Sequence, residues 1–116
     1  MITLLALLLA TVKPPTATAD PGHVRLASSS WCWGTHCGAP IAASGKPVVV
    51  ARDATVRIRF SVVPTSVRVA VSGKTLVVLR SGSEVSWRVR RRGGMTVNVT
   101  FRGGFVTYVG RLAATR

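Results

Sequence analysis

Apolar and polar residues alternate one for one through much of the second half of the chain. The clearest run is residues 55–63, where every second residue is apolar: Val56, Ile58, Phe60 and Val62. Residues 84–90 and 95–102 follow the same rule. Successive side chains of a β-strand point to opposite faces, so this period predicts strands with one buried face and one exposed face. We therefore expect an all-β, antiparallel fold.

Turn-forming residues separate these runs at short intervals, as in Ser72-Gly73-Lys74 and Ser81-Gly82-Ser83. Seven or eight short strands joined by Gly-rich turns are typical of a two-sheet, immunoglobulin-like antiparallel sandwich. A small β-barrel has a similar pattern and is the alternative. The continuous apolar stretch at residues 76–79 is expected either to be buried on both faces or to cross between the two sheets.

Residues 1–19 are expected to form a signal peptide. Residues 2–12 are apolar but too few to span a bilayer as a helix, and Ala17-Thr18-Ala19 suits signal-peptidase cleavage before Asp20. The apolar run is not preceded by Lys or Arg, which is atypical of such signals. We expect a secreted or cell-envelope protein with an N-terminal segment at residues 20–46. Residues 47–116 then form the main body of a single domain.

The two cysteines, Cys32 and Cys37, are expected to form a disulfide. In an oxidising compartment outside the cytoplasm an even pair most simply forms one, and Gly34 can supply the tight turn that a small ring needs. The rival interpretation is a metal or redox site that combines this pair with His36 and His23. That spacing matches none of the paired zinc motifs, so we expect no metal and no other cofactor.

The same loop is a candidate contact site because it carries Trp31, Trp33 and His36. The two tryptophans flank Cys32 and are expected on opposite sides of the segment, one indole packed on the core and the other partly exposed. An exposed indole can stack on a sugar ring, a base or a lipid headgroup. The alternative is that both indoles only cover the end of the core and that His36 is a hydrogen-bonding loop residue.

The motif Trp31-Cys32-Trp33, followed by Cys37, Pro40 and strands rich in Arg and Val, resembles small exported β-sandwich proteins of actinobacteria. Those proteins share an aromatic-Cys-Trp motif, a Gly-rich loop, a second Cys and a C-terminal sandwich without assigned activity. The chain departs from them in its shorter loop between the cysteines, in having no acidic residue after Cys37 and in having no lipid-anchoring Cys. The resemblance implies an exported envelope domain and transfers no catalytic residue.

The chain is strongly basic, with 16 Lys and Arg against three acids and a formal net charge of +13. If the strands on either side of Pro64 pair as a hairpin, then Arg57, Arg59 and Arg68 share one exposed face. A second basic patch is expected to combine the arginines that follow: Arg88, Arg90, Arg91, Arg92 and Arg102. Basic patches attract anionic polymers and anionic surfaces. The alternative is that these arginines only keep exposed strands soluble.

The sequence gives little support for an enzyme. The three acids, Asp20, Asp53 and Glu84, are too few and too scattered for paired-carboxylate chemistry, and the serines lack the Gly-x-Ser-x-Gly turn of many hydrolases. We expect a non-catalytic domain that binds an anionic cell-wall polymer or membrane surface through its basic faces, without specific nucleic-acid recognition. The alternative is a structural or protein-interaction module with no polyanion ligand.

Overall fold

The computed structural model describes residues 13–42 and 45–115, so most of the expected signal peptide lies outside the described residues. Strands make up the regular secondary structure of the described part, and no helix occurs there. In chain order they are β1 (Ala17–Asp20), β2 (Val24–Arg25), β3 (Ala27–Trp33), β4 (His36–Gly38), β5 (Val48–Val50), β6 (Thr55–Phe60), β7 (Ser66–Val71), β8 (Lys74–Leu76), β9 (Leu79–Ser81), β10 (Glu84–Arg88), β11 (Gly93–Phe101) and β12 (Gly104–Ala114). These strands are more numerous than the seven or eight predicted.

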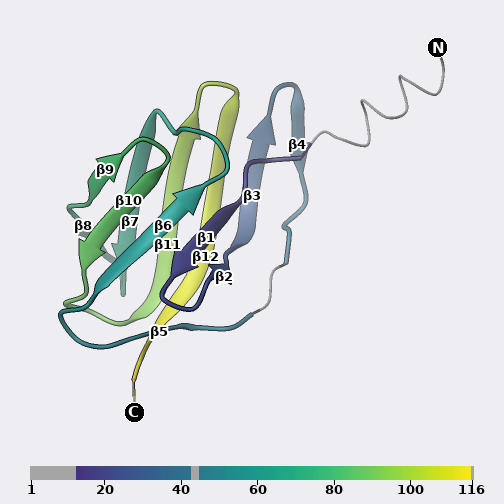
Figure 1. The fold of residues 1–116 in the computed structure, drawn as a ribbon. Coiled ribbons are helices and arrows are strands. Elements are labelled where there is room, and N and C mark those ends of the chain that lie inside the picture. Colours follow the sequence, from purple (N-terminus) through teal and green to yellow (C-terminus); the bar gives the residue numbers. More distant parts are fainter. Residues whose placement is uncertain (1–12, 43–44, 116) are drawn as a thin grey trace.

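The strands form two separate sheets that pack face to face (Figure 1). The five-stranded sheet has the order β2-β1-β6-β10-β9. The seven-stranded sheet has the order β4-β3-β12-β11-β7-β8, and β5 pairs in parallel with the end of β12. All other named strand pairs are antiparallel. The predicted all-β sandwich is confirmed, and the sheets do not close into a barrel.

The core is formed by the apolar residues that the alternation predicts. Val56, Ile58 and Phe60 of β6 are buried from the five-stranded side, and every second residue of β11 is buried from the other. Phe60 joins the two sheets: its ring centroid lies 6.2 Å from that of Phe101 and 5.9 Å from that of Tyr108. Burial of these faces is the main favourable term for a domain of this size.

Strand β6 does not pair with β7, which corrects the predicted hairpin around Pro64. The chain leaves the five-stranded sheet after Phe60, and residues 61–65 carry it across to β7 in the seven-stranded sheet. Val62, expected on the buried face, is 40% exposed because the strand has already ended. Strands that are neighbours in sequence therefore lie in opposite layers here.

The apolar stretch at residues 76–79 crosses between the sheets, as one of the two predicted alternatives stated. It connects β8 at one edge of the seven-stranded sheet to β9 at one edge of the five-stranded sheet. The other alternative, burial on both faces, does not hold: Val77 is 94% exposed and Leu79 is 75% exposed. This edge of the sandwich has no further strand over it among the described residues.

Residues just before Asp20 are part of the five-stranded sheet. Ala17 and Ala19 have no exposed surface and pair with Phe60 and Ile58 of β6. The hydroxyl of Tyr108, on the opposite sheet, donates a 2.6 Å hydrogen bond to the carbonyl oxygen of Pro15. The predicted cleavage before Asp20 remains a prediction, and cleavage there would remove three of the four residues of β1 from the sandwich.

A chain that begins at Asp20 is therefore expected to unfold at a markedly lower urea concentration than a chain that begins at Lys13. The shorter chain loses the buried methyl groups of Ala17 and Ala19, and β2 and β6 lose the strand between them. Tryptophan fluorescence can follow unfolding of both chains. Equal midpoints would contradict the place of β1 in the fold and would leave the predicted cleavage site acceptable.

Replacing Tyr108 with Phe is expected to reduce the free energy of unfolding by about 1–3 kcal/mol, since the buried carbonyl of Pro15 loses its donor. Burial raises the pKa of Tyr108 well above its ordinary value of 10.0. The hydroxyl therefore keeps its proton in the folded state but ionises above about pH 10 in the unfolded chain. Its contribution is complete below pH 10 and declines as the pH rises further. Urea unfolding between pH 7 and 11 should show this decline in the native protein, and a parallel decline in Tyr108→Phe would exclude Tyr108 as its source.

Candidate functional site

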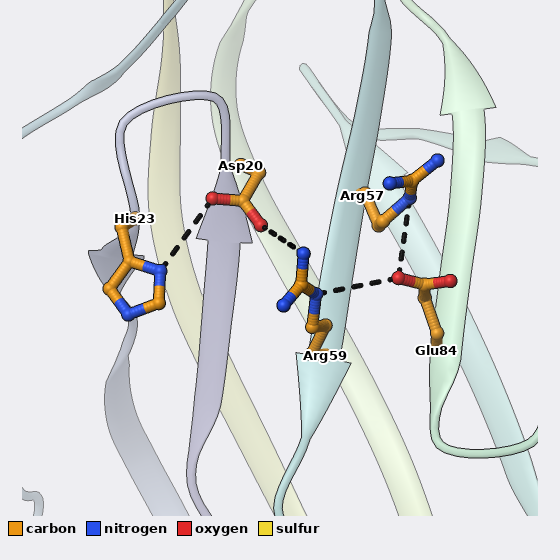
Figure 2. A network of polar contacts seen from close by, with 5 residues as sticks. All are labelled: Asp20, His23, Arg57, Arg59 and Glu84. Carbon is orange, nitrogen blue, oxygen red and sulfur yellow. Dashed lines mark ion pairs between the residues drawn. The ribbon is translucent and has the colours of Figure 1, made fainter.

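The outer face of the five-stranded sheet carries alternating charges rather than a purely basic patch (Figure 2). Arg59 Nη2 lies 3.4 Å from Asp20 Oδ2, and Arg59 Nε lies 3.5 Å from Glu84 Oε1. The same carboxylate oxygen of Glu84 lies 3.2 Å from Arg57 Nε. His23 Nδ1 lies 3.8 Å from Asp20 Oδ1 at one end of the row.

Strand register explains this network. Antiparallel pairing places Asp20 opposite Arg57 and Glu84 opposite Arg59, so acids on the two strands that flank β6 lie beside its arginines. Asp20 pairs diagonally with Arg59, two residues along β6. Exposed ion pairs of this kind contribute little to stability. They do lower the local positive charge, so Arg57 and Arg59 present a weaker basic surface than the sequence predicts.

Arg68 lies on the other side of the molecule from Arg57 and Arg59. It belongs to β7, where it pairs with Asn98 of β11, and its side chain is on the exposed face of the seven-stranded sheet. The predicted patch of three arginines is therefore wrong. Its premise was a hairpin between β6 and β7, and these strands lie in different sheets.

The second predicted patch is also divided. Arg88, Arg90, Arg91 and Arg92 lie close together in residues 88–92, which we call the arginine segment and which leads from the end of β10 to the start of β11. Arg102 follows the far end of β11, a strand of nine residues. At about 3.3 Å per residue, Arg102 is on the order of 30 Å from Arg92.

The arginine segment borders a cavity of about 290 Å³ lined by Arg52, Val89, Arg90 and Arg92. We call these four residues the arginine pocket. Arg52 comes from the loop between β5 and β6, which two backbone hydrogen bonds hold beside the arginine segment. The amide of Asp53 donates to the carbonyl of Val89 at 2.9 Å, and the amide of Val89 donates to the carbonyl of Ala54 at 2.9 Å.

The seven-stranded sheet fixes the other end of the arginine segment. Ser72, at the turn after β7, donates its hydroxyl to the carbonyl of Arg92 and its amide to the carbonyl of Gly94, each at 2.8 Å. Gly93 has a φ of 126°, and a Cβ at this position would overlap the hydroxyl of Ser72. Glycine is therefore required where the chain passes Ser72.

Positive charge predominates around the arginine pocket. The one acid nearby is Asp53, whose Oδ1 lies 3.5 Å from Arg90 Nε. The carbonyl of Asp53 also accepts a 3.4 Å hydrogen bond from Arg88 Nε. Arg92 Nε is buried and has no hydrogen-bond partner among the described residues. Trp87 Nε1 is a second buried side-chain nitrogen without a partner in the described part of the chain.

A second cavity, of about 270 Å³, is basic as well. The charged residues in its lining are Arg25, Lys46 and Arg111. It lies beside β2 and β12, and no acidic side chain belongs to its described lining. Both cavities therefore present cations, as expected when acids are few and already paired.

The disulfide between Cys32 and Cys37 is present, and the two residues lie directly opposite each other on β3 and β4. The expectation that Trp31 and Trp33 point to opposite sides is wrong. Residues two apart in a strand share a face, and both indoles pack against the core. His36 is exposed on β4.

Each tryptophan has a defined packing partner. The ring of Trp33 meets that of Phe101 edge-on, with centroids 5.8 Å apart. Trp31 Nε1 donates a 3.0 Å hydrogen bond to the carbonyl of Ala39, and its ring lies where a Cβ of Gly38 would be. Both indoles are partly buried against the core. This packing agrees better with the alternative interpretation, in which they cover the end of the core, than with an exposed indole that stacks on a ligand.

Searches against protein-family models, curated proteins and solved structures find no match. Within residues 13–42 and 45–115, no group of three or more His, Cys, Asp or Glu side chains is placed to hold a metal ion. The same residues contain no helix with the length and hydropathy needed to cross a bilayer. The arginine pocket is the candidate site, because three arginines line it and backbone hydrogen bonds join the two segments that carry them. The sequence pattern indicated the arginine segment but missed Arg52. Arg52 reaches the pocket only because the β5–β6 loop is hydrogen-bonded to the arginine segment, which is distant in sequence.

Removing the disulfide by a Cys32→Ser/Cys37→Ser substitution is expected to lower the free energy of unfolding by about 2 kcal/mol. The effect is modest because the disulfide closes only a short loop. The sandwich core should still unfold in one cooperative transition, at a lower denaturant concentration. Equilibrium unfolding of the variant and of the native protein measures this difference. Loss of the cooperative transition would contradict a purely local role for the disulfide.

Proposed function

We propose that the protein is a non-catalytic, exported β-sandwich domain that binds anionic cell-envelope material through its basic surface. The observation that carries this proposal is the concentration of arginines around the arginine pocket, with a single carboxylate beside them. Guanidinium groups suit phosphate and carboxylate ligands because each can make two parallel hydrogen bonds.

The placement of the acids supports the same proposal. All three acidic residues of the chain, Asp20, Asp53 and Glu84, already lie within 4 Å of an arginine. Few internal partners are left to neutralise the remaining cations, so a polyanion can neutralise them and release its counterions. The disulfide is compatible with an extracytoplasmic location, where anionic wall polymers and phospholipid headgroups occur.

The exposed apolar edge favours a second candidate function, that of a protein-interaction module. Val77 and Leu79 are largely exposed where the chain crosses from β8 to β9, and Val63 is 61% exposed in the β6–β7 loop. The side chain of Arg80 links the two regions by donating a 3.0 Å hydrogen bond to the carbonyl of Pro64. Exposed apolar residues beside edge strands are a common feature of protein contacts.

The native protein is expected to sediment with cell-wall sacculi and with anionic liposomes at low salt, and much less at ~0.15 M salt. Arg88→Ser/Arg91→Ser should weaken sedimentation, because both residues belong to the arginine segment without lining the pocket. Arg57→Ser/Arg59→Ser removes the same charge from the acid-paired face and should have a smaller effect. Trp31→Ala/Trp33→Ala tests the disulfide loop as a contact site.

Three results would contradict this proposal. The native protein could fail to sediment at low salt, which would favour the protein-interaction module. Sedimentation could be insensitive to salt, which would exclude charge neutralisation as its cause. The two arginine variants could also weaken sedimentation equally, which would mean that total charge and not the arginine segment determines binding.

A further inference from the structure

We infer that the arginine pocket binds a phosphate group that carries two negative charges, either as free phosphate or as a terminal phosphomonoester. The inference deepens the proposed function and rests on it for the source of the phosphate, which is anionic envelope material. It concerns one small site, formed by Arg52, Arg90 and Arg92, and not the basic surface as a whole.

Charge at the pocket matches such a ligand. Three arginines line it, and the nearest carboxylate, that of Asp53, lies beside Arg90. Three cationic side chains against one carboxylate leave two positive charges unmatched. A phosphomonoester carries nearly two negative charges at neutral pH, whereas a carboxylate or a phosphodiester carries one. The dianion therefore neutralises the pocket most completely.

The guanidinium groups of the pocket also suit an anionic ligand. A guanidinium group stays protonated in proteins and donates several hydrogen bonds. Arg92 Nε is buried, so contact with phosphate oxygens is left to the terminal nitrogens of Arg92 and to the guanidinium groups of Arg52 and Arg90.

Hydrogen bonds fix the main chain that carries these arginines before any ligand binds. Hydrogen bonds between residues 53–54 and Val89 join the loop of Arg52 to the arginine segment. Those from Ser72 fix the carbonyls on either side of Gly93, directly after Arg92. A main chain that is fixed in advance loses less conformational entropy on binding. The volume, about 290 Å³, is at the small end of ligand cavities and suits one compact group.

Thermal unfolding in sodium phosphate, compared with sodium chloride at equal ionic strength and pH 7.5, tests this inference on the full chain. Ligand that binds only the folded state raises the midpoint. Phosphate should raise the midpoint of the native protein. From the concentration dependence, Arg92→Lys and Arg52→Gln should each bind phosphate about tenfold more weakly, because each loses charged hydrogen bonds to the ligand.

The variants distinguish phosphate binding at the pocket from non-specific attraction of phosphate to the basic surface. Arg92→Lys keeps the charge and removes only the guanidinium geometry, and Arg102→Gln removes one charge at the far end of β11 as the matched control. Arg102→Gln should bind phosphate as the native protein does. If Arg92→Lys does not fold, Arg52→Gln, in the loop between β5 and β6, decides the outcome. Equal phosphate stabilisation of the native protein and both pocket variants would overturn the inference, as would no stabilisation of the native protein.

Small esters and pH test the charge of the ligand. Methyl phosphate should stabilise the native protein more than dimethyl phosphate, which carries a single charge. The effect of methyl phosphate should weaken as the pH falls through about 6, where its second proton binds, and dimethyl phosphate should show no such change. Equal effects of the two esters at pH 7.5 would contradict selection for a dianion.

Lipid vesicles distinguish a phosphomonoester on a membrane surface from free phosphate as the ligand of the pocket. Vesicles containing phosphatidic acid present a phosphomonoester, and vesicles containing phosphatidylglycerol present a diester; the pocket should favour the first, and free phosphate should compete with it. Failure of the proposed function and failure of this inference give different results. Sacculi that bind a protein insensitive to phosphate would leave the proposed function standing and overturn the pocket. Phosphate binding by a protein that does not sediment with sacculi would support the pocket and contradict the proposed function.

Discussion

The structure depends on the contact between two apolar sheet faces. Phe60 on one sheet meets Phe101 and Tyr108 on the other, and the valines of β6, β7, β10 and β11 fill the space around these rings. Because side chains alternate along each strand, burying the apolar face places every second residue outside. The arginines of the strands occupy those outside positions. The surface charge of the molecule is thus determined by the same alternation that forms its core.

The route of the chain between the sheets determines which charges meet. Strand β6 lies between β1 and β10, whose acids face its arginines across the five-stranded sheet. The crossing from β10 to β11 has one acid beside it in the described chain, Asp53, and its arginines gather at one end of the sandwich beside Arg52. Cations are therefore largely paired on one face and largely unpaired at this end, although the local sequences are similarly basic.

Much of the architecture could be predicted from the sequence because alternation is a local property. Residues 55–60, 84–88 and 95–101 follow it closely, and the cysteine pair lies on adjacent strands as a short loop requires. Non-local pairing could not be predicted in this way. Nothing in residues 61–65 shows that β6 and β7 enter different sheets, so the expected grouping of Arg57, Arg59 and Arg68 was wrong. The shared orientation of Trp31 and Trp33, in contrast, follows from strand geometry alone.

The central claim is that the arginines around the β10–β11 crossing, which outnumber the one carboxylate beside them, form an anion site distinct from the rest of the basic surface. Proton–nitrogen NMR spectra of the arginine Nε–H groups, recorded while inorganic phosphate is added at constant ionic strength, test it most directly. The account predicts that the signals of Arg52, Arg90 and Arg92 shift together and saturate, while those of Arg57, Arg59 and Arg102 change little. Small, unsaturated shifts of similar size at all arginines would contradict it and would reduce the pocket to one part of a uniformly basic surface.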